Sequence, residues 1–94
     1  MKYVLFYESM NGSGEEMMAA LRLHYPAHRA RLDAFHARGV LLWVGPFAKP
    51  EQGAMGVFTT ADAAEEFMQG DPFMTNGIVK TWSVREWREI YGPP

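Results

Sequence analysis

The chain has 94 residues, of which 48% are hydrophobic and 21% charged, and its formal net charge at pH 7 is -2. This length supports one hydrophobic core, so we expect a single domain over residues 1–94 of ordinary globular composition. The chain contains no cysteine, which excludes disulfides, thiolate catalysis and zinc–thiolate sites. Its slightly negative charge supplies no basic field, so we expect no nucleic-acid partner.

The N-terminal segment MKYVLFYES forms the first predicted strand, over residues 2–8. Alternation along it places Tyr3, Leu5 and Tyr7 on one face. The segment lacks the apolar core and cleavage site of a secretory signal. No stretch approaches the roughly 20 apolar residues that span a bilayer. We therefore expect a cytoplasmic protein that does not engage a membrane.

A helical pattern begins at residue 15 and is interrupted at Pro26. Proline has no N–H to donate to the preceding turn and its ring clashes there, so we expect Pro26 to end, kink or restart the helix. A restart would place Pro26 at the first helical position, where a missing N–H costs nothing. The second piece runs to Arg38 and ends at Gly39, a residue suited to a left-handed terminator.

The remaining elements follow at short intervals. Strands are predicted over residues 40–47 and 54–60, and the short loop between them favours an antiparallel hairpin. A helix from about residue 60 to 69 and a last strand over 78–87 complete the chain. In that strand Ile78 and Val79 should lie on opposite faces. The order β-α-β-β-α-β predicts an α+β, ferredoxin-like antiparallel four-stranded sheet with both helices on one face.

The predicted strands carry large apolar side chains on both faces, for example Leu5 beside Phe6 and Leu42 beside Trp43. Two helices cover only one face, and the other would expose an apolar patch larger than monomers usually show. We therefore predict a homodimer that stacks two copies through this sheet face. The alternative is that loops and the C-terminal tail fold over it.

Three histidines lie in the first helical region: His24, His28 and His36. The first two are four residues apart, the spacing of a common metal-ligand pair on a helix. Pro26 separates them, however, and no carboxylate completes the zinc-helix pattern, so we expect no metal site. His36 is interpreted as a surface residue.

His28 shares a helical stripe with Leu32 and Phe35, the face that should turn toward the sheet. It is either a hydrogen-bonded core histidine or an acid–base group, and the second role requires a carboxylate partner that fixes the ring tautomer. Asp71 is the candidate partner. Its position before Pro72 equally suits a helix N-cap, and these residues alone leave both questions open.

The segments PAHRARLDAFHARG, LLWVGPF and GDPFMTNGIVKTWSVREW resemble the YCII-related (YciI-like) family of the dimeric α+β barrel superfamily. That family has a histidine in a PAH-type motif, a Gly-Pro after the second strand and an Asp-Pro-aromatic sequence before the last strand. Here these signals fall on His28, on Gly45 and Pro46, and on residues 71–73. The Gly-rich segment SMNGSGEEMM departs from some relatives and leaves the substrate open.

The resemblance implies that His28 and Asp71 meet in a cleft between the two sheets of a dimer and form an active-site pair. Few relatives have an assigned reaction, and some of those are dehydrochlorinases or lactone-processing enzymes for small aromatic-derived compounds. We therefore expect a small-molecule enzyme in which the pair acts as general acid or base in elimination, dehydrochlorination or isomerisation. No cysteine is present and no serine is obviously placed for covalent catalysis, and we expect no cofactor.

The expected substrate-binding residues are Tyr7, Trp43 and Phe73, near the strand ends, together with Gly45 and Pro46. The alternative is a non-catalytic module of the same fold that binds a small ligand or an interaction partner.

Overall fold

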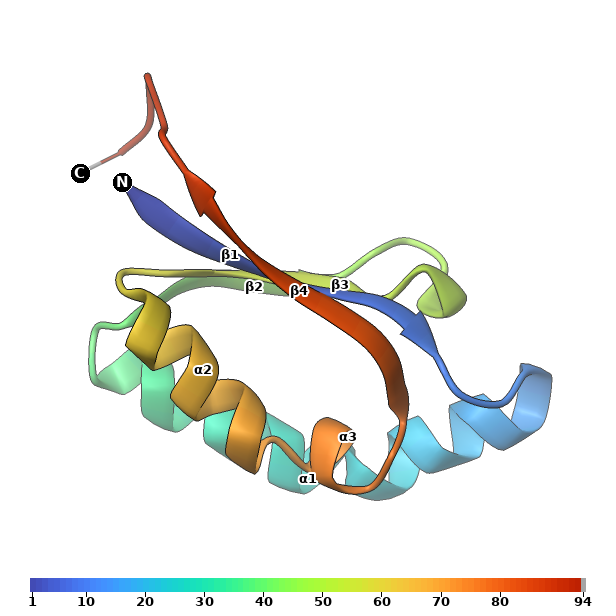
Figure 1. Ribbon diagram of the computed structural model, residues 1–94. Helices are drawn as coiled ribbons and strands as arrows, with labels where there is room; N and C mark the ends of the chain where they lie inside the picture. The colour runs from blue at the N-terminus through green and yellow to red at the C-terminus, as the bar shows by residue number, and fades with distance from the viewer. Residues whose placement is uncertain (94) are drawn as a thin grey trace.

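The computed structural model describes residues 1–93 and contains a four-stranded antiparallel sheet covered by helices on one side (Figure 1). Its elements in chain order are β1 (Lys2–Met10), α1 (Gly14–Ala37), β2 (Leu41–Pro46), the 3₁₀ turn η1 (Pro50–Gln52), β3 (Ala54–Phe58), α2 (Ala61–Gly70), α3 (Pro72–Thr75) and β4 (Val79–Trp87). The strand order is β2-β3-β1-β4. The predicted ferredoxin-like α+β fold is confirmed, and the short helix α3 is an addition to it.

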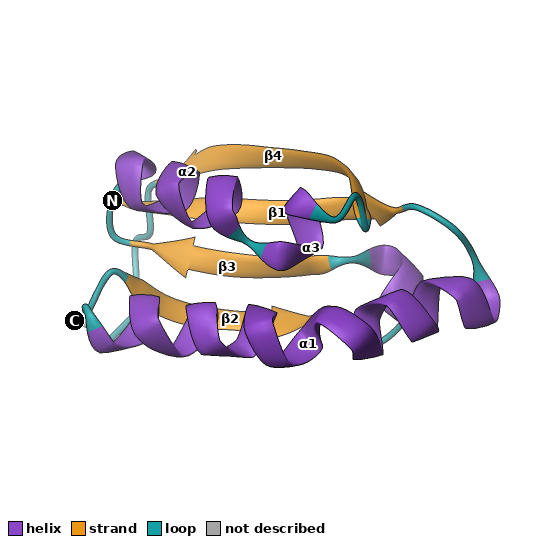
Figure 2. Ribbon diagram, turned by 90° about the horizontal axis from the view of Figure 1, so that it is seen from below, coloured by secondary structure: helices purple, strands orange, loops and turns teal. Residues whose placement is uncertain are grey.

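The helices form a single layer against the sheet. Figure 2 shows α1 following the edge strand β2, with α2 and α3 beside it over the other strands. α1 is one continuous helix of 24 residues that contains Pro26. Of the three outcomes expected at Pro26, an end and a restart are therefore wrong. Residues on both sides of Pro26, among them Met17 and Phe35, are buried, and this packing holds the helix together across the lost hydrogen bond.

The core lies between the helices and the sheet. Leu5 and Tyr7 of β1 face the helices, in register with Gly56 and Ala54 of β3. Ile78 and Val79, expected on opposite faces, both join this core. Ile78 precedes β4, and the register of β1 with β4 shifts beside Val79, so strict alternation does not apply there. The core cluster consists of Leu5, Tyr7, Phe35, Leu41, Phe58, Ala63, Ala64, Phe67, Met68, Phe73, Ile78 and Val79.

The other face of the sheet carries no helix (Figure 1). Val4 and Val57 pair across β1 and β3 there and are buried, whereas Trp43 and Trp87 are 49% and 45% exposed. The C-terminal tail lines a hollow on this face, but Tyr91 is itself 92% exposed and the tail leaves both tryptophans nearly half exposed. No helix within residues 1–93 is both long and apolar enough to cross a membrane.

Candidate active site

The fold brings His28 and Asp71 together although they are 43 residues apart in the chain. His28 Nδ1 lies 2.6 Å from Asp71 Oδ1; the His28 side chain is 11% exposed and that of Asp71 is completely buried. Asp71 sits between α2 and α3, where its side chain also accepts the Phe73 N–H at 3.2 Å as the N-cap of α3. Capping and pairing are therefore not alternatives, because the cap geometry holds the carboxylate in the place where His28 reaches it.

Tyr7 supplies a third contact to this carboxylate. Its O–H lies 2.5 Å from Asp71 Oδ2. A carboxylate accepts hydrogen bonds, and the backbone N–H of Phe73 can only donate to it. With Tyr7 and Phe73 as donors, the His28 contact is satisfied when Nδ1 carries the proton, which leaves the Nε2 lone pair free.

Burial raises the pKa of the Tyr7 phenol far above its ordinary value, and the adjacent Asp71 carboxylate raises it further. Desolvation disfavours a phenolate inside the core, and a second negative charge beside Asp71 would repel the first. Tyr7 is therefore a permanent hydrogen-bond donor to Asp71 at any physiological pH.

Aromatic contacts fix the His28 ring. Phe73 stacks on it with ring centroids 3.8 Å apart and an interplanar angle of 7°, and Phe67 approaches edge-on at 6.3 Å. The stacking and the hydrogen bond to Asp71 together restrain the orientation of the imidazole ring. The ring is held as an oriented group with one free nitrogen.

A cavity of about 600 Å³ lies between α1 and the sheet, and His28 and Tyr7 line it. Most of its walls are aliphatic or aromatic, including Leu5, Leu21 and Leu32. Within residues 1–93 no hydrogen-bond partner of His28 Nε2 is found, and no buried side-chain nitrogen or oxygen is left without a partner, so Nε2 is not sealed in the core. The cavity has the volume and the apolar character of a small-molecule site.

The predicted pocket residues divide into two groups. Tyr7, Gly45, Pro46 and Phe73 line the cavity that His28 lines. Trp43 does not: a register shift between Leu41 and Trp43 pairs Trp43 with Val57, on the helix-free face. The prediction that Trp43 lies beside the pair is therefore wrong.

The predicted position of the cleft is also wrong. We expected the pair between the stacked sheets of two copies, but α1 carries His28 and covers the opposite face of the sheet. The cavity beside the pair is lined by residues of α1 on one side and of the sheet on the other.

Arg31, one helical turn after His28, was not identified from the sequence. Its Nε donates to the Phe67 carbonyl at 3.0 Å and its NH2 group to the Glu66 carbonyl at 2.7 Å, so it caps the last turn of α2. The guanidinium lies so close to Gly70 that a Cβ there would be 2.5 Å from its central carbon. Arg31 therefore fixes the end of α2 immediately before Asp71. The sequence signal that could have identified Arg31 is its position three residues after His28, which places the two side chains next to each other on a helix.

The other two histidines are not hydrogen-bonded to the His28–Asp71 pair within residues 1–93, although His36 lines the same cavity. His36 Nδ1 lies 2.8 Å from the Leu41 carbonyl and ties α1 to the start of β2, while the rest of the residue is exposed as expected. His24 makes no side-chain hydrogen bond within residues 1–93. Over the same residues no three histidine, aspartate or glutamate side chains gather in a way that could hold a metal ion.

Fold and site together define a ferredoxin-like α+β protein with a buried His–Asp–Tyr network at one wall of an apolar cavity. The chain matches the YCII-related domain over residues 1–88 and belongs to that family. It is 28% identical over 102 aligned residues to Protein YciI of Escherichia coli O6:H1 and, with the same values, to Protein YciI of Shigella flexneri, in each case covering 97% of this chain and 100% of the relative.

Among solved structures the chain is similar to the 5-chloro-2-hydroxyhydroquinone dehydrochlorinase TftG of Burkholderia phenoliruptrix AC1100 in complex with 2,5-dihydroxybenzoquinone. The TM-score is 0.70, the identity is 17%, and the alignment covers 94% of each chain. At this identity the similarity establishes a shared fold.

Proposed function

We propose that this protein is a proton-transfer enzyme for a small molecule, with His28 as general base and acid and Asp71 as the group that orients it. The observation that carries this proposal is the asymmetry of the imidazole. Its Nδ1 is engaged by a buried carboxylate, and its Nε2 has no partner within residues 1–93 while the ring lines the cavity. This is the arrangement of an oriented general base.

The network around Asp71 supports both directions of proton transfer. When Nε2 takes a proton, the imidazolium carries a positive charge 2.6 Å from the Asp71 carboxylate, which stabilises it. When Nε2 returns the proton, Tyr7 and the Phe73 N–H still satisfy that carboxylate. His28 therefore cycles between its two states without leaving a buried charge unpartnered.

The lining of the cavity favours proton transfer over covalent catalysis. No serine, threonine or lysine is among the described residues that line it, and the chain has no cysteine. Tyr7 is a poor nucleophile because burial raises the pKa of its phenol and its proton is held by Asp71. Isomerisation requires only the removal and return of a proton, and elimination or dehydrochlorination requires removal of a proton together with departure of a leaving group such as chloride. None of these reactions needs a nucleophile from the protein, so they are the reactions this site suits.

The structural relative supplies the first compound to test. TftG is named for dehydrochlorination of 5-chloro-2-hydroxyhydroquinone and was solved with 2,5-dihydroxybenzoquinone. An elimination of that kind removes one proton, which His28 would take, and releases one chloride ion to solvent with the electron pair of its carbon–chlorine bond. The cavity volume of about 600 Å³ accommodates a ring compound of this size.

The working unit is a homodimer that buries the helix-free face of the sheet. Trp43 and Trp87 on that face are each nearly half exposed, and the tail leaves them so. Stacking a second copy would remove this apolar surface from water.

The function is tested by measuring chloride release from 5-chloro-2-hydroxyhydroquinone by wild type, His28→Ala and the control His24→Ala. Loss of the general base should lower turnover about 100- to 10,000-fold, whereas His24→Ala should retain it. Folding of each variant is checked by circular dichroism. If folded His28→Ala releases chloride as wild type does, His28 is not the base. If wild type binds 2,5-dihydroxybenzoquinone but turns over neither this substrate nor related ring compounds, the protein is a binding module.

A further inference from the structure

Several of the polar side chains that line the cavity are already hydrogen-bonded. Tyr7 donates to the fully buried Asp71, which also engages His28 Nδ1. Arg29 Nε donates to Asp33 Oδ1 at 3.0 Å, so these two charges neutralise each other at the helix surface. His36 is bonded through Nδ1 two helical turns beyond the pair. A ligand in contact with His28 thus meets few polar groups that are still free.

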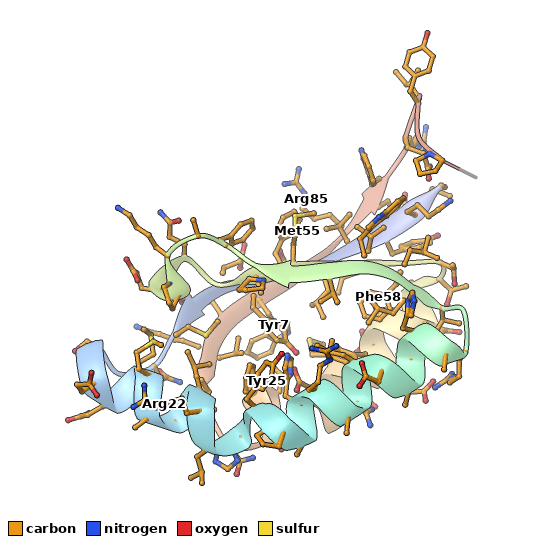
Figure 3. All side chains as sticks on the ribbon, turned by 180° about the vertical axis from the view of Figure 1, so that it is seen from behind. Tyr7, Arg22, Tyr25, Met55, Phe58 and Arg85 are labelled. Atoms are coloured by element: carbon orange, nitrogen blue, oxygen red, sulfur yellow. The ribbon has the colours of Figure 1, made fainter. Side chains whose placement is uncertain are left out.

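In the described part of the chain, Tyr25 keeps a free donor beside the His28 ring. It lies in α1 one turn before His28, lines the same cavity and is 47% exposed, with its ring centroid 6.1 Å from that of the imidazole. Its oxygen accepts a hydrogen bond from Arg29 at 3.3 Å, and within residues 1–93 its O–H proton has no acceptor. Figure 3 shows the side chains of Tyr7 and Tyr25 in the space between the sheet and α1, and both line the cavity. Tyr7 spends its proton on Asp71, whereas Tyr25 retains its own.

We infer that Tyr25 donates its phenolic O–H to an oxygen of the ligand, and that the site selects small, mainly apolar compounds carrying a carbonyl or hydroxyl oxygen close to the proton that His28 removes. This inference rests on the proposed function and adds the second contact of the ligand to it. His28 Nε2 as acceptor and the neighbouring Tyr25 hydroxyl as donor lie in a cavity with mainly apolar walls, and together they recognise a ligand that presents the complementary pair. The Arg29 guanidinium polarises the phenol and makes it a stronger donor.

The chemistry of the two groups is complementary. When Nε2 of His28 takes a proton from the carbon next to a carbonyl, the C–H electron pair forms a carbon–carbon double bond. The carbonyl π electrons then move to the oxygen, which becomes an enolate and is stabilised by the Tyr25 O–H. The imidazolium returns the proton to a different atom in an isomerisation. In an elimination the electrons instead return to expel chloride, and the proton passes to water.

The test uses acetophenone, which carries a carbonyl acceptor, and ethylbenzene, which is of similar shape and carries none. Both are titrated into ¹⁵N-labelled wild type, Tyr25→Phe and the control Tyr91→Phe, whose ring is 92% exposed, and the His28 resonances report occupancy. Wild type and Tyr91→Phe should prefer acetophenone. Tyr25→Phe should lose about three- to tenfold of that preference, the effect of one net hydrogen bond.

Two results would overturn the inference, and they differ in whether they also contradict the proposed function. If acetophenone shifts His28 equally well in wild type and in folded Tyr25→Phe, Tyr25 is not the donor and the proposed function is untouched. If neither compound perturbs His28 in wild type at concentrations up to their solubility, the cavity does not admit such ligands, and the proposed function fails with the inference.

Discussion

Replacing Tyr7 by phenylalanine tests the buried network through its dependence on pH. The substitution removes one hydroxyl that donates to the Asp71 carboxylate. A hydrogen bond to a charged group contributes about 1.5–3 kcal/mol, so at pH 8 the free energy of unfolding should fall by that amount. Raising the pH should then narrow the difference in the free energy of unfolding between wild type and Tyr7→Phe.

The pKa of Tyr7 is raised in the folded protein, chiefly by burial, whereas in the unfolded chain it titrates near its ordinary value of about 10. The stabilisation from Tyr7 is therefore complete below pH 10 and is lost as the pH rises further, because only the unfolded state releases the proton. At pH 11 the unfolded phenol is about ten-elevenths ionised, and the wild type should have lost about 1.4 kcal/mol that Tyr7→Phe does not lose.

Urea unfolding followed by tryptophan fluorescence at pH 8, 10, 10.5 and 11 measures this difference. The lysines and the remaining tyrosines titrate in both proteins, so their contributions cancel in the difference between wild type and Tyr7→Phe. Tyr91→Phe is the control, since Tyr91 is 92% exposed and should ionise alike in both states. A gap between wild type and Tyr7→Phe that stays constant from pH 8 to 11 would refute the buried, donating phenol.

Three further predictions concern the scaffold of the site and its assembly. Gly53→Ala should destabilise the protein by about 2–5 kcal/mol in urea unfolding. Gly53 has a φ of +86°, and the Cβ of an alanine there would lie 1.7 Å from the Tyr7 carbonyl oxygen. Gly39→Ala is the control, because Gly39 has a φ of +77° but an added Cβ would meet no atom within 4 Å, so this variant measures the backbone strain alone. Equal losses of stability in the two variants would contradict the clash at Gly53. Arg31→Met removes the hydrogen bonds to the last turn of α2 and should lower the free energy of unfolding by about 1–3 kcal/mol. It should also broaden the NMR resonances of Asp71 and His28. Sharp, unshifted resonances would show that Arg31 does not position Asp71. Sedimentation velocity should give the wild type about twice the chain mass of 10.7 kDa. Trp43→Glu on the helix-free face should convert it to a monomer, whereas the control Leu23→Glu, at an exposed position of α1, should leave it dimeric. A monomeric wild type would refute the dimer.

Most of the fold could be predicted from the sequence because its signals are local. Alternation in residues 2–8 gave the faces of β1, and Gly39 and Gly70 lie at the ends of α1 and α2. Pro26 could not be interpreted in the same way. Whether a helix survives an internal proline depends on burial on both sides of it, which the local sequence does not contain.

The site was predictable in part for the same reason. His28 stood out by its place on an apolar stripe, and Asp71 by its position before Pro72. Tyr7 was expected only as a lining residue, because its bond to Asp71 joins positions 64 residues apart. Trp43 was expected in the pocket because it lies near a strand end, but a register shift in β2 pairs it with Val57 on the helix-free face, and nearness to a strand end does not reveal such a shift.

The protonation of the His28 ring is the central claim, and long-range ¹H–¹⁵N correlation spectroscopy of the neutral imidazole measures it directly. The proton should be found on Nδ1, with the ¹⁵N shift of Nε2 that of an unprotonated nitrogen, and 2,5-dihydroxybenzoquinone should perturb Nε2 more than Nδ1. A proton found on Nε2 instead would mean that no free base faces the cavity, and proton transfer by His28 would have to be abandoned.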